Sequence, residues 1–164
     1  MSRLIVCTVV CLLCLGCGSR GTEYPQTGNS RLNFSARRAS PRLVPNWEEV
    51  KTPGSTFFSS KDVLYLSPNI ELSNSDIEST GVELRRSLWF VVIRLSEPAK
   101  RKFADLSSDM ADGPHEMLAV LVDGKIASAP TVLAPVTDGL ITIGGVFSES
   151  EEEARRLAKG IVGI

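Results

Sequence analysis

Cysteine is missing from almost the whole sequence. The chain has 164 residues, and its four cysteines (Cys7, Cys11, Cys14 and Cys17) all lie within the first 17. The residues between them are mainly leucine and valine, whereas a zinc site needs a polar, turn-forming framework and usually histidine. We therefore predict no metal, no other cofactor, and no disulfide in the remainder of the chain.

Residues that usually carry catalysis are also scarce. The single histidine, His115, lies in a predicted loop between proline and glutamate. Ser107 and Ser108 have no neighbouring base that could activate a nucleophile. The acidic residues Glu149 and 151–153 mark a predicted helix start, where the helix dipole already favours negative charge. These observations predict that the protein is not an enzyme.

Neither sign of charge is in clear excess. The sequence has 18 lysines and arginines against 19 aspartates and glutamates. A nucleic-acid-binding domain normally shows a basic excess, so we predict no nucleic-acid partner. Gly144 and Gly145 precede a predicted helix, but no lysine follows in the frame of a phosphate-binding loop. The acidic residues at that helix start would also repel an anion.

Runs of apolar residues long enough to cross a membrane are missing after the N-terminus. Arg3 precedes an apolar run from Leu4 to Leu15 of about a dozen residues, too short to span ~30 Å of hydrocarbon with confidence. We predict that residues 1–16 form a signal peptide of the bacterial lipoprotein type and that Cys17 becomes the lipidated N-terminus. Cys14 departs from the usual motif, and an ordinary secretory leader is the alternative. Either signal predicts export to the periplasm or cell exterior, and lipidation adds membrane anchoring.

A polar stretch follows the predicted signal peptide. Residues 17–60 are rich in glycine, serine, asparagine, threonine, arginine and proline, and they show no sustained apolar period. We predict a flexible tether that lets a lipid-anchored domain stand clear of the membrane. A further possibility is weak, salt-sensitive contact with anionic headgroups through four arginines: Arg31, Arg37, Arg38 and Arg42.

Residues 61–164 carry the patterns of a folded domain. Apolar runs predict strands at residues 62–66, 88–95, 117–122 and 140–143, and the second should be a central strand buried on both faces. A short helix is expected over residues 76–79, capped by Ser73 or Ser75 and stopped by Gly81. These elements predict an α+β fold, a mainly antiparallel sheet with helices on one face, close to a ferredoxin-like layout.

Two longer helices have clear apolar faces. One begins after Ser96 and ends at Asp112, and the other begins with a capping box of Ser148 and Glu151 and ends near Lys159, with Gly160 past its end. The residues expected to face the core are Ala99, Phe103, Leu106 and Met110 in the first helix, and Ala154, Leu157, Ala158 and Ile161 in the second.

The strongest local signal is a β-hairpin. Asp123 and Gly124 separate two apolar runs, and Asp-Gly supplies the two positive φ angles that a tight primed turn requires. Lys125 should resume the extended chain. Pro130 is expected at a strand end, an edge or a bulge, because it donates no ladder hydrogen bond. Gly144-Gly145 should break or bulge the strand before it.

These motifs together resemble the head region of SecD, a subunit of the SecDF protein-export machinery. The matching segments are Val122-Asp123-Gly124-Lys125, Ser128-Ala129-Pro130, Ile143-Gly144-Gly145-Val146-Phe147 and the acidic helix of residues 148–160, with upstream likeness at residues 89–96 and 102–106. The resemblance covers roughly the last hundred residues. SecD also carries several transmembrane helices that house a proton-coupled motor, and no counterpart follows the leader here.

The resemblance implies a non-enzymatic, membrane-tethered binding module that assists protein export or handles unfolded envelope polypeptides. Its expected partners are unfolded or translocating polypeptide, components of the Sec translocon, or both. The alternative is a structural or ligand-binding envelope lipoprotein that reuses the fold with an unrelated partner. The expected contact surfaces are a sheet edge and the loop from Ala129 to Gly139. Within that loop, the candidate residues are Ala129, Pro130, Thr131, Val132, Leu133, Asp138 and Gly139.

Lipidation at Cys17 predicts the behaviour of one variant. Cys17→Ser should move the protein out of the membrane fraction, because serine cannot receive the thioether-linked lipid. Fractionation with a carbonate wash, followed by immunoblotting, measures this. A variant that still sediments with membranes after the wash would contradict the lipoprotein assignment.

Overall fold

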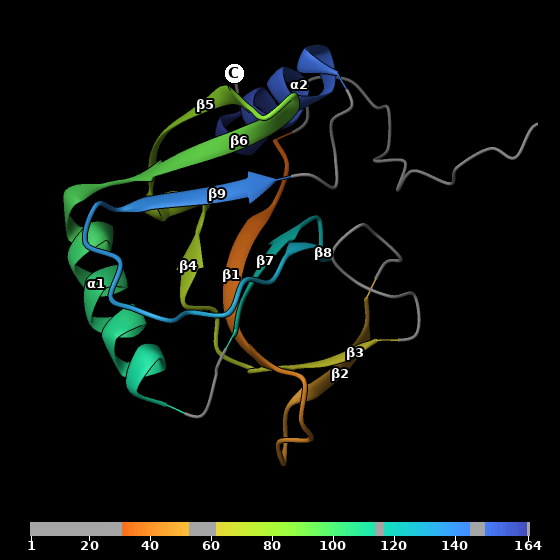
Figure 1. The fold of residues 1–164 in the computed structure, drawn as a ribbon, viewed down its shortest axis with the longest axis vertical. Coiled ribbons are helices and arrows are strands. Elements are labelled where there is room, and N and C mark those ends of the chain that lie inside the picture. Colours follow the sequence, from red (N-terminus) through yellow and green to blue (C-terminus); the bar gives the residue numbers. More distant parts are fainter. Residues whose placement is uncertain (1–30, 53–61, 114–116, 145–149, 164) are drawn as a thin grey trace, which may run out of the picture.

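The computed structural model describes residues 31–52, 62–113, 117–144 and 150–163 (Figure 1). The predicted signal peptide and Cys17 lie outside these ranges, as do His115, Gly145 and Phe147. The described elements follow in the order β1 (Phe34–Ser40), β2 (Glu48–Lys51), β3 (Val63–Leu66), β4 (Leu72–Ser73), the 3-10 helix η1 (Asn74–Asp76), β5 (Ile77–Arg85), β6 (Leu88–Leu95), α1 (Glu97–Asp112), β7 (Met117–Val122), β8 (Lys125–Ser128), β9 (Leu140–Gly144) and α2 (Glu151–Val162).

The strands form two sheets. The larger sheet has the order β2-β3-β1-β7-β8, with β4 also paired to β1, and the smaller has the order β5-β6-β9. Every pairing between the described strands is antiparallel. The predicted α+β class with antiparallel strands is therefore confirmed, although the strands are divided between two sheets. The ferredoxin-like layout stays a prediction.

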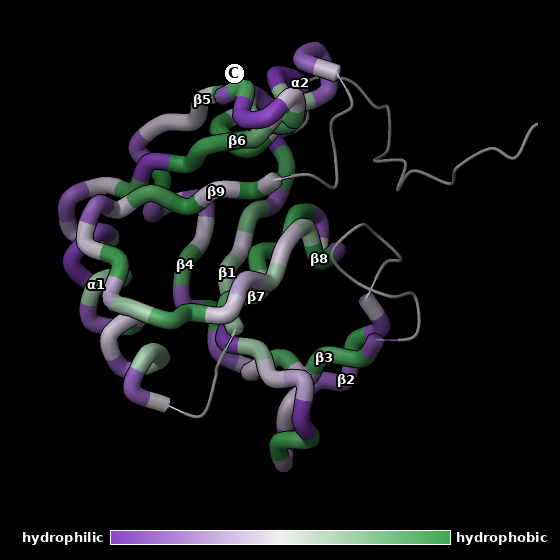
Figure 2. The backbone as a smooth tube through the Cα atoms, in the orientation of Figure 1, coloured by the Kyte–Doolittle hydropathy of each residue, from purple (hydrophilic) through white to green (hydrophobic). Residues whose placement is uncertain are grey.

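The strand that is buried on both faces is β7, not β6. Figure 2 shows the apolar character of β6, but only alternate residues such as Val91 and Ile93 are fully buried, and Arg94 is exposed. In β7, five of the six residues are buried. Alternate side chains point to opposite faces of a strand, so β7 contributes to two apolar clusters. β6 is the central strand of the smaller sheet, as predicted, but the prediction that both its faces are buried was wrong, because one face of this sheet has no described layer packed against it.

The main core lies between the two sheets and both helices. It contains buried residues of β1, β6, β7, β9, α1 and α2, among them Phe34, Ile93, Phe103, Val120 and Ile161. A second apolar cluster lies on the other face of the larger sheet and consists of Ala39, Leu64, Leu66, Ala119, Leu121, Ile126 and Ala129. β7 therefore holds the two clusters together.

The flexible tether predicted for residues 17–60 is wrong for residues 34–51. β1 lies inside the larger sheet, between β3 and β7. Its pairing with β7 runs from Phe34 opposite Val122 to Ala39 opposite Met117. β2 forms the edge of the same sheet, paired to β3. The domain therefore begins well before residue 61.

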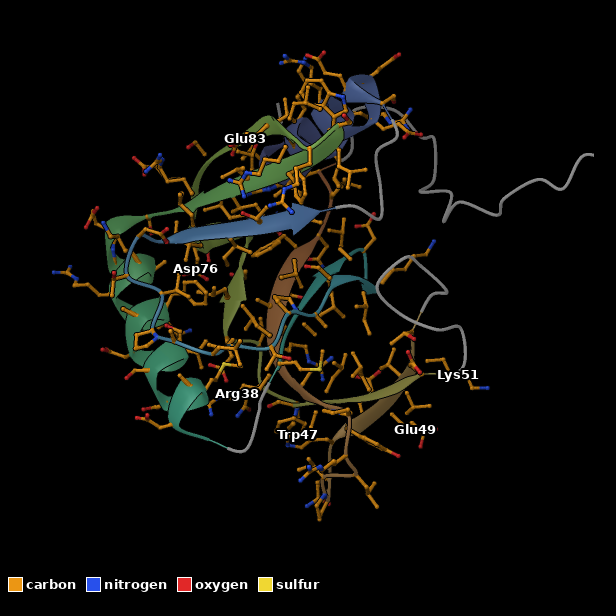
Figure 3. The ribbon with its side chains drawn as sticks, in the orientation of Figure 1. Arg38, Trp47, Glu49, Lys51, Asp76 and Glu83 are labelled. Carbon is orange, nitrogen blue, oxygen red and sulfur yellow. The ribbon has the colours of Figure 1, made fainter. Side chains whose placement is uncertain are left out.

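Two arginines explain why the sequence pattern did not predict β1 as a strand. Arg37 and Arg38 interrupt the apolar alternation. Their side chains are nevertheless only 15% and 27% exposed, and each has an acidic partner (Figure 3 labels Arg38). The Arg37 guanidinium lies 2.9 Å from a carboxylate oxygen of Glu48, and that of Arg38 lies 3.6 Å from Glu71. The ion pairs make charged residues compatible with a central strand.

Helix α1 has the predicted limits, and all four residues expected on its inner face are buried. Helix α2 also buries its predicted stripe, but both predicted ends are wrong. Its N-cap is Ser150, whose Oγ accepts a hydrogen bond from the Glu153 amide at 3.3 Å. The helix continues to Val162 and ends at Gly163, which has φ 78°. Gly160 lies within the helix, where its lack of a side chain leaves room for Leu32.

The short helix predicted over residues 76–79 is wrong. The chain makes only the turn η1 and then enters β5, a strand of 9 residues that pairs along β6. The Ser73 amide donates to the Asp76 carboxylate at 2.8 Å, so the polar residues close a turn instead of opening a helix. Gly81 lies inside β5 rather than at a helix end.

One side chain connects the two sheets and the last helix. The Asn74 amide nitrogen donates to the carbonyls of Leu32 at 2.9 Å and Ile161 at 2.8 Å. Its Oδ1 accepts from the Phe34 amide at 2.9 Å. Asn74 thus satisfies backbone groups at the entrance to β1 and the end of α2, immediately before β5.

This arrangement predicts that Asn74→Ala lowers the free energy of unfolding by about 2–4 kcal/mol, because three hydrogen bonds to partly buried backbone groups are lost. Urea denaturation followed by circular dichroism measures the change. Asn74→Asp is the sharper variant, since it keeps the acceptor but loses both donated bonds. Asn69→Ala, at an exposed position, is the control; an equal loss there would contradict the role of Asn74.

Candidate functional site

The Asp-Gly hairpin has the predicted geometry. Asp123 and Gly124 have φ 49° and 74°, and Val122 faces Lys125 across the turn. Asp123 also has a role that the turn signal did not reveal. Its Oδ1 accepts from the Asn33 amide at 2.8 Å, and its own amide donates to the Asn33 carbonyl at 2.8 Å. The turn is therefore fastened to the residue that precedes β1.

The first half of the candidate loop, Ala129 to Gly139, packs along β7. Ala129 is buried in the second apolar cluster. The Pro130 carbonyl accepts from the Leu118 amide at 3.0 Å, and Thr131 forms an isolated bridge with Met117. Pro130 follows the end of β8, as predicted.

The second half of the loop is attached to α1 and β6. Val132 is buried in the main core, and the Val136 amide donates to Ser107 Oγ at 2.8 Å. Asp138 Oδ1 accepts from the Leu140 amide at 3.0 Å. The Gly139 carbonyl accepts from the Leu95 amide at 3.0 Å. The loop therefore forms a surface of defined shape.

Gly139 and Gly144 are required by close packing. Gly139 has φ 69°, and a Cβ there would lie 2.8 Å from the Lys100 side chain. A Cβ on Gly144 would collide with the ring of Phe90, which faces it across β6 and β9. The structure thus gives these motif residues structural roles, as it does Asp123 and Gly124.

Leu133 is the large apolar residue that this loop offers to solvent, with 77% of its surface exposed. Four other large apolar residues are also exposed among the described residues: Leu43, Ile70, Leu84 and Leu88. Leu84 and Leu88 flank the turn between β5 and β6. Together with Arg85, Arg86 and Ser87 they form what we call the hairpin tip. Our reading of the sequence missed this tip because it contains no glycine, asparagine or proline to mark a turn.

The hairpin tip has unusual backbone geometry. Arg86 and Ser87 have φ 49° and 65°, which residues with a side chain rarely adopt. Beside them, the Arg85 guanidinium donates to Glu83 at 2.6 Å, and this hydrogen bond lowers the pKa of the Glu83 carboxyl from its ordinary value. Arg85 also lies 5.6 Å from the centre of the Phe90 ring. Figure 3 labels Glu83 on β5, at the opposite end of the molecule from Arg38 and Glu49.

The described residues do not gather a set of side chains that could hold a metal ion. Within them, no three histidine, cysteine, aspartate or glutamate side chains converge. Glu151, Glu152 and Glu153 are exposed in the first turn of α2. What the described surface offers is apolar side chains and a free strand edge, which suit contact with another chain.

In the same described ranges, neither helix is long and apolar enough to cross a membrane.

Ser107 gives a test of how the candidate loop is held. Its Oγ accepts from Val136 and donates to the Ala104 carbonyl at 3.1 Å, and the residue is fully buried. We expect Ser107→Ala to lower the free energy of unfolding by about 1–2 kcal/mol, because it leaves the Val136 amide unpaired. Hydrogen exchange at Val136 should become about tenfold faster. Ser108→Ala is the adjacent control, and unchanged exchange in Ser107→Ala would show that the loop is held by other contacts.

Comparison with known proteins identifies sequences that are similar to this chain. The family model of the SecDF P1 head subdomain matches residues 50–162. The protein translocase subunit SecD of Acidaminococcus fermentans is 34% identical over 91 residues, which are 55% of this chain and 21% of SecD. The chain thus spans about a fifth of that relative.

Solved structures share the fold. One is a structure of SecDF, described as a membrane component that enhances protein export; it has a TM-score of 0.62 and 18% identity over 82% of this chain and 64% of that chain. SecDF in its super-membrane-facing form gives a TM-score of 0.62 and 18% identity over 82% of this chain and 19% of that chain. From the family match and the shared fold, the chain belongs to the SecDF P1 head subdomain family.

Proposed function

We propose that the protein is a non-enzymatic binding module, tethered to the membrane, that assists protein export by contacting unfolded or translocating polypeptide. The observation that carries this proposal is Leu133, an apolar side chain presented to solvent by a loop whose ends are fixed to β7, α1 and β6. A rigidly presented apolar residue can bind an apolar segment without the entropic cost of ordering the loop first.

The composition of the loop supports contact with a chain rather than with a small molecule. Pro130, Thr131, Leu133, Pro135 and Thr137 are exposed. They offer exposed apolar and hydroxyl groups, whereas the residues that line small-molecule sites are usually buried in a cleft. Components of the Sec translocon are the second class of partner for the same surface.

The proposed tether is the lipid on Cys17. The first described strand, β1, begins at Phe34, so 16 residues lie between Cys17 and β1. A chain of that length can span at most about 55 Å. The module would then act close to the membrane surface on the exported side. Placing the domain near the point where polypeptides emerge raises its effective concentration toward them.

A second candidate function is that of an envelope lipoprotein with an unrelated partner. It is favoured by the low identity, 18%, between this chain and the solved SecDF structures that share its fold. A shared fold does not by itself transmit a partner. The two candidates differ in the partner that the loop contacts.

Site-specific photocrosslinking separates them. A photoreactive amino acid at Leu133 should capture polypeptides in transit or translocon subunits. The same probe at Leu43, which is 75% exposed in the turn between β1 and β2, is the matched control. Capture at Leu133 of a single envelope protein unrelated to export would favour the second candidate. Equal capture from both positions would contradict a specific role for the loop.

A further inference from the structure

Among the described strands, β5 is a long strand of the smaller sheet that has no neighbour on its outer side. β5 is the end strand of the order β5-β6-β9, and it is 9 residues long. The β5–β6 hairpin closes with the two-residue turn of Arg86 and Ser87, so Arg85 and Leu88 form the closing pair. In a two-residue hairpin the closing pair is hydrogen bonded, and the pairs then alternate along the ladder.

This alternation determines which backbone groups of β5 face outward. Residues in non-hydrogen-bonded pairs direct their N–H and C=O groups away from the partner strand. On β5 these residues are Thr80, Val82 and Leu84, which lie opposite Ile93, Val91 and Trp89. Among the hydrogen bonds that the structure gives for its described residues, none involves the backbone of Thr80, Val82 or Leu84 outside the sheet. Six polar groups are therefore available at this edge.

The side chains along the edge differ between the two faces. Leu84, 54% exposed, lies on the same face as Trp89 and Val82, which pack partly against the main core. Glu83 and Arg85 occupy the opposite face as an exposed ion pair. A chain lying along this edge would find an apolar neighbour on one face and charged neighbours on the other, which is the pattern of an extended segment with alternating residues.

The N-terminal end of β5 is less suited to pairing with another strand. The register shifts between Ile77 and Ser79, which places Glu78 in a bulge. Bulges and charged residues are features that stop strands from pairing along an edge. The available edge is therefore confined to residues 80–85, next to the hairpin tip.

We propose that the edge of β5 from Thr80 to Arg85 binds an extended polypeptide segment by strand addition, with an apolar residue of that segment beside Leu84. The partial charges of the edge alternate between N–H and C=O, and the backbone of another chain is their natural complement. Lipid is a poor match, because hydrocarbon offers these groups no hydrogen-bonding partner. The proposal rests on the proposed polypeptide-binding function, but it uses a different surface from the Leu133 loop.

Amide hydrogen exchange measured by NMR on the full chain tests this proposal. The probe is a ten-residue peptide of alternating valine and threonine. Without peptide, the Thr80, Val82 and Leu84 amides should exchange quickly, while those of Gly81 and Glu83 are already protected by β6. Saturating peptide should slow exchange at Thr80, Val82 and Leu84 by tenfold or more. Peptide binding that protects only residues of the 129–139 loop would overturn the proposal while leaving the proposed function intact.

Two controls separate strand addition from adhesion to apolar surface. The same peptide with an N-methyl group at every residue should lose the protection, because it keeps its side chains but can donate no backbone hydrogen bond from either edge. Leu84→Asp should weaken peptide binding at least tenfold, and Leu133→Asp should leave the β5 edge protection unchanged. If both leucine variants bind the peptide normally, both surfaces are excluded.

Self-association and lipid binding are the remaining outcomes. Protection of the same three amides without peptide, increasing with protein concentration, would assign the edge to a second copy of the chain and overturn the proposal. Protection by phosphatidylglycerol vesicles in place of peptide would assign it to the membrane, and would overturn it too.

Discussion

The Asn74 side chain joins parts of the fold that lie far apart in the chain. Its amide reaches backbone atoms from the entrance to β1 and the end of α2, 42 and 87 residues away in sequence. Those backbone groups lie where helices and strands end, so they have no regular partner of their own. One side chain with both donors and an acceptor can satisfy all three. Because Asn74 lies immediately before β5, these hydrogen bonds tie the start of β5 to β1 and to the end of α2.

The elements that were predicted from the sequence are those defined by near neighbours. Asp123-Gly124 specifies its own turn, because the required φ angles depend on two adjacent residues. The spacing of Ala99, Phe103, Leu106 and Met110 gives one helical face regardless of what packs against it. Both signals are local, and both agree with the structure.

The elements that were missed depend on partners far along the chain. β1 is a strand because β7 pairs with it and because acidic residues balance its arginines, and neither condition appears in residues 34–40 alone. The residues of β5 are mostly polar and follow a predicted helix cap, yet they form a strand because they pair with β6 along its length. The sequence predicted the loop from Ala129 to Gly139 as a candidate surface. It could not predict how that loop is held, because Ser107 and Val136 come into contact only in the folded protein. The sequence did not predict the hairpin tip, because Arg86 and Ser87 are residues that rarely adopt the positive φ angles of this turn.

The place of β1 within the larger sheet has a consequence for biogenesis. β1 is the first strand to be made, and its hydrogen-bonding partner β7 begins at residue 117. A chain that emerges N-terminus first cannot complete this sheet until Ser128, the last residue of β8, has been synthesised. Long-range pairing of this kind delays folding. The larger sheet can therefore be completed only late in synthesis, and β1 waits for most of that time without its longest partner.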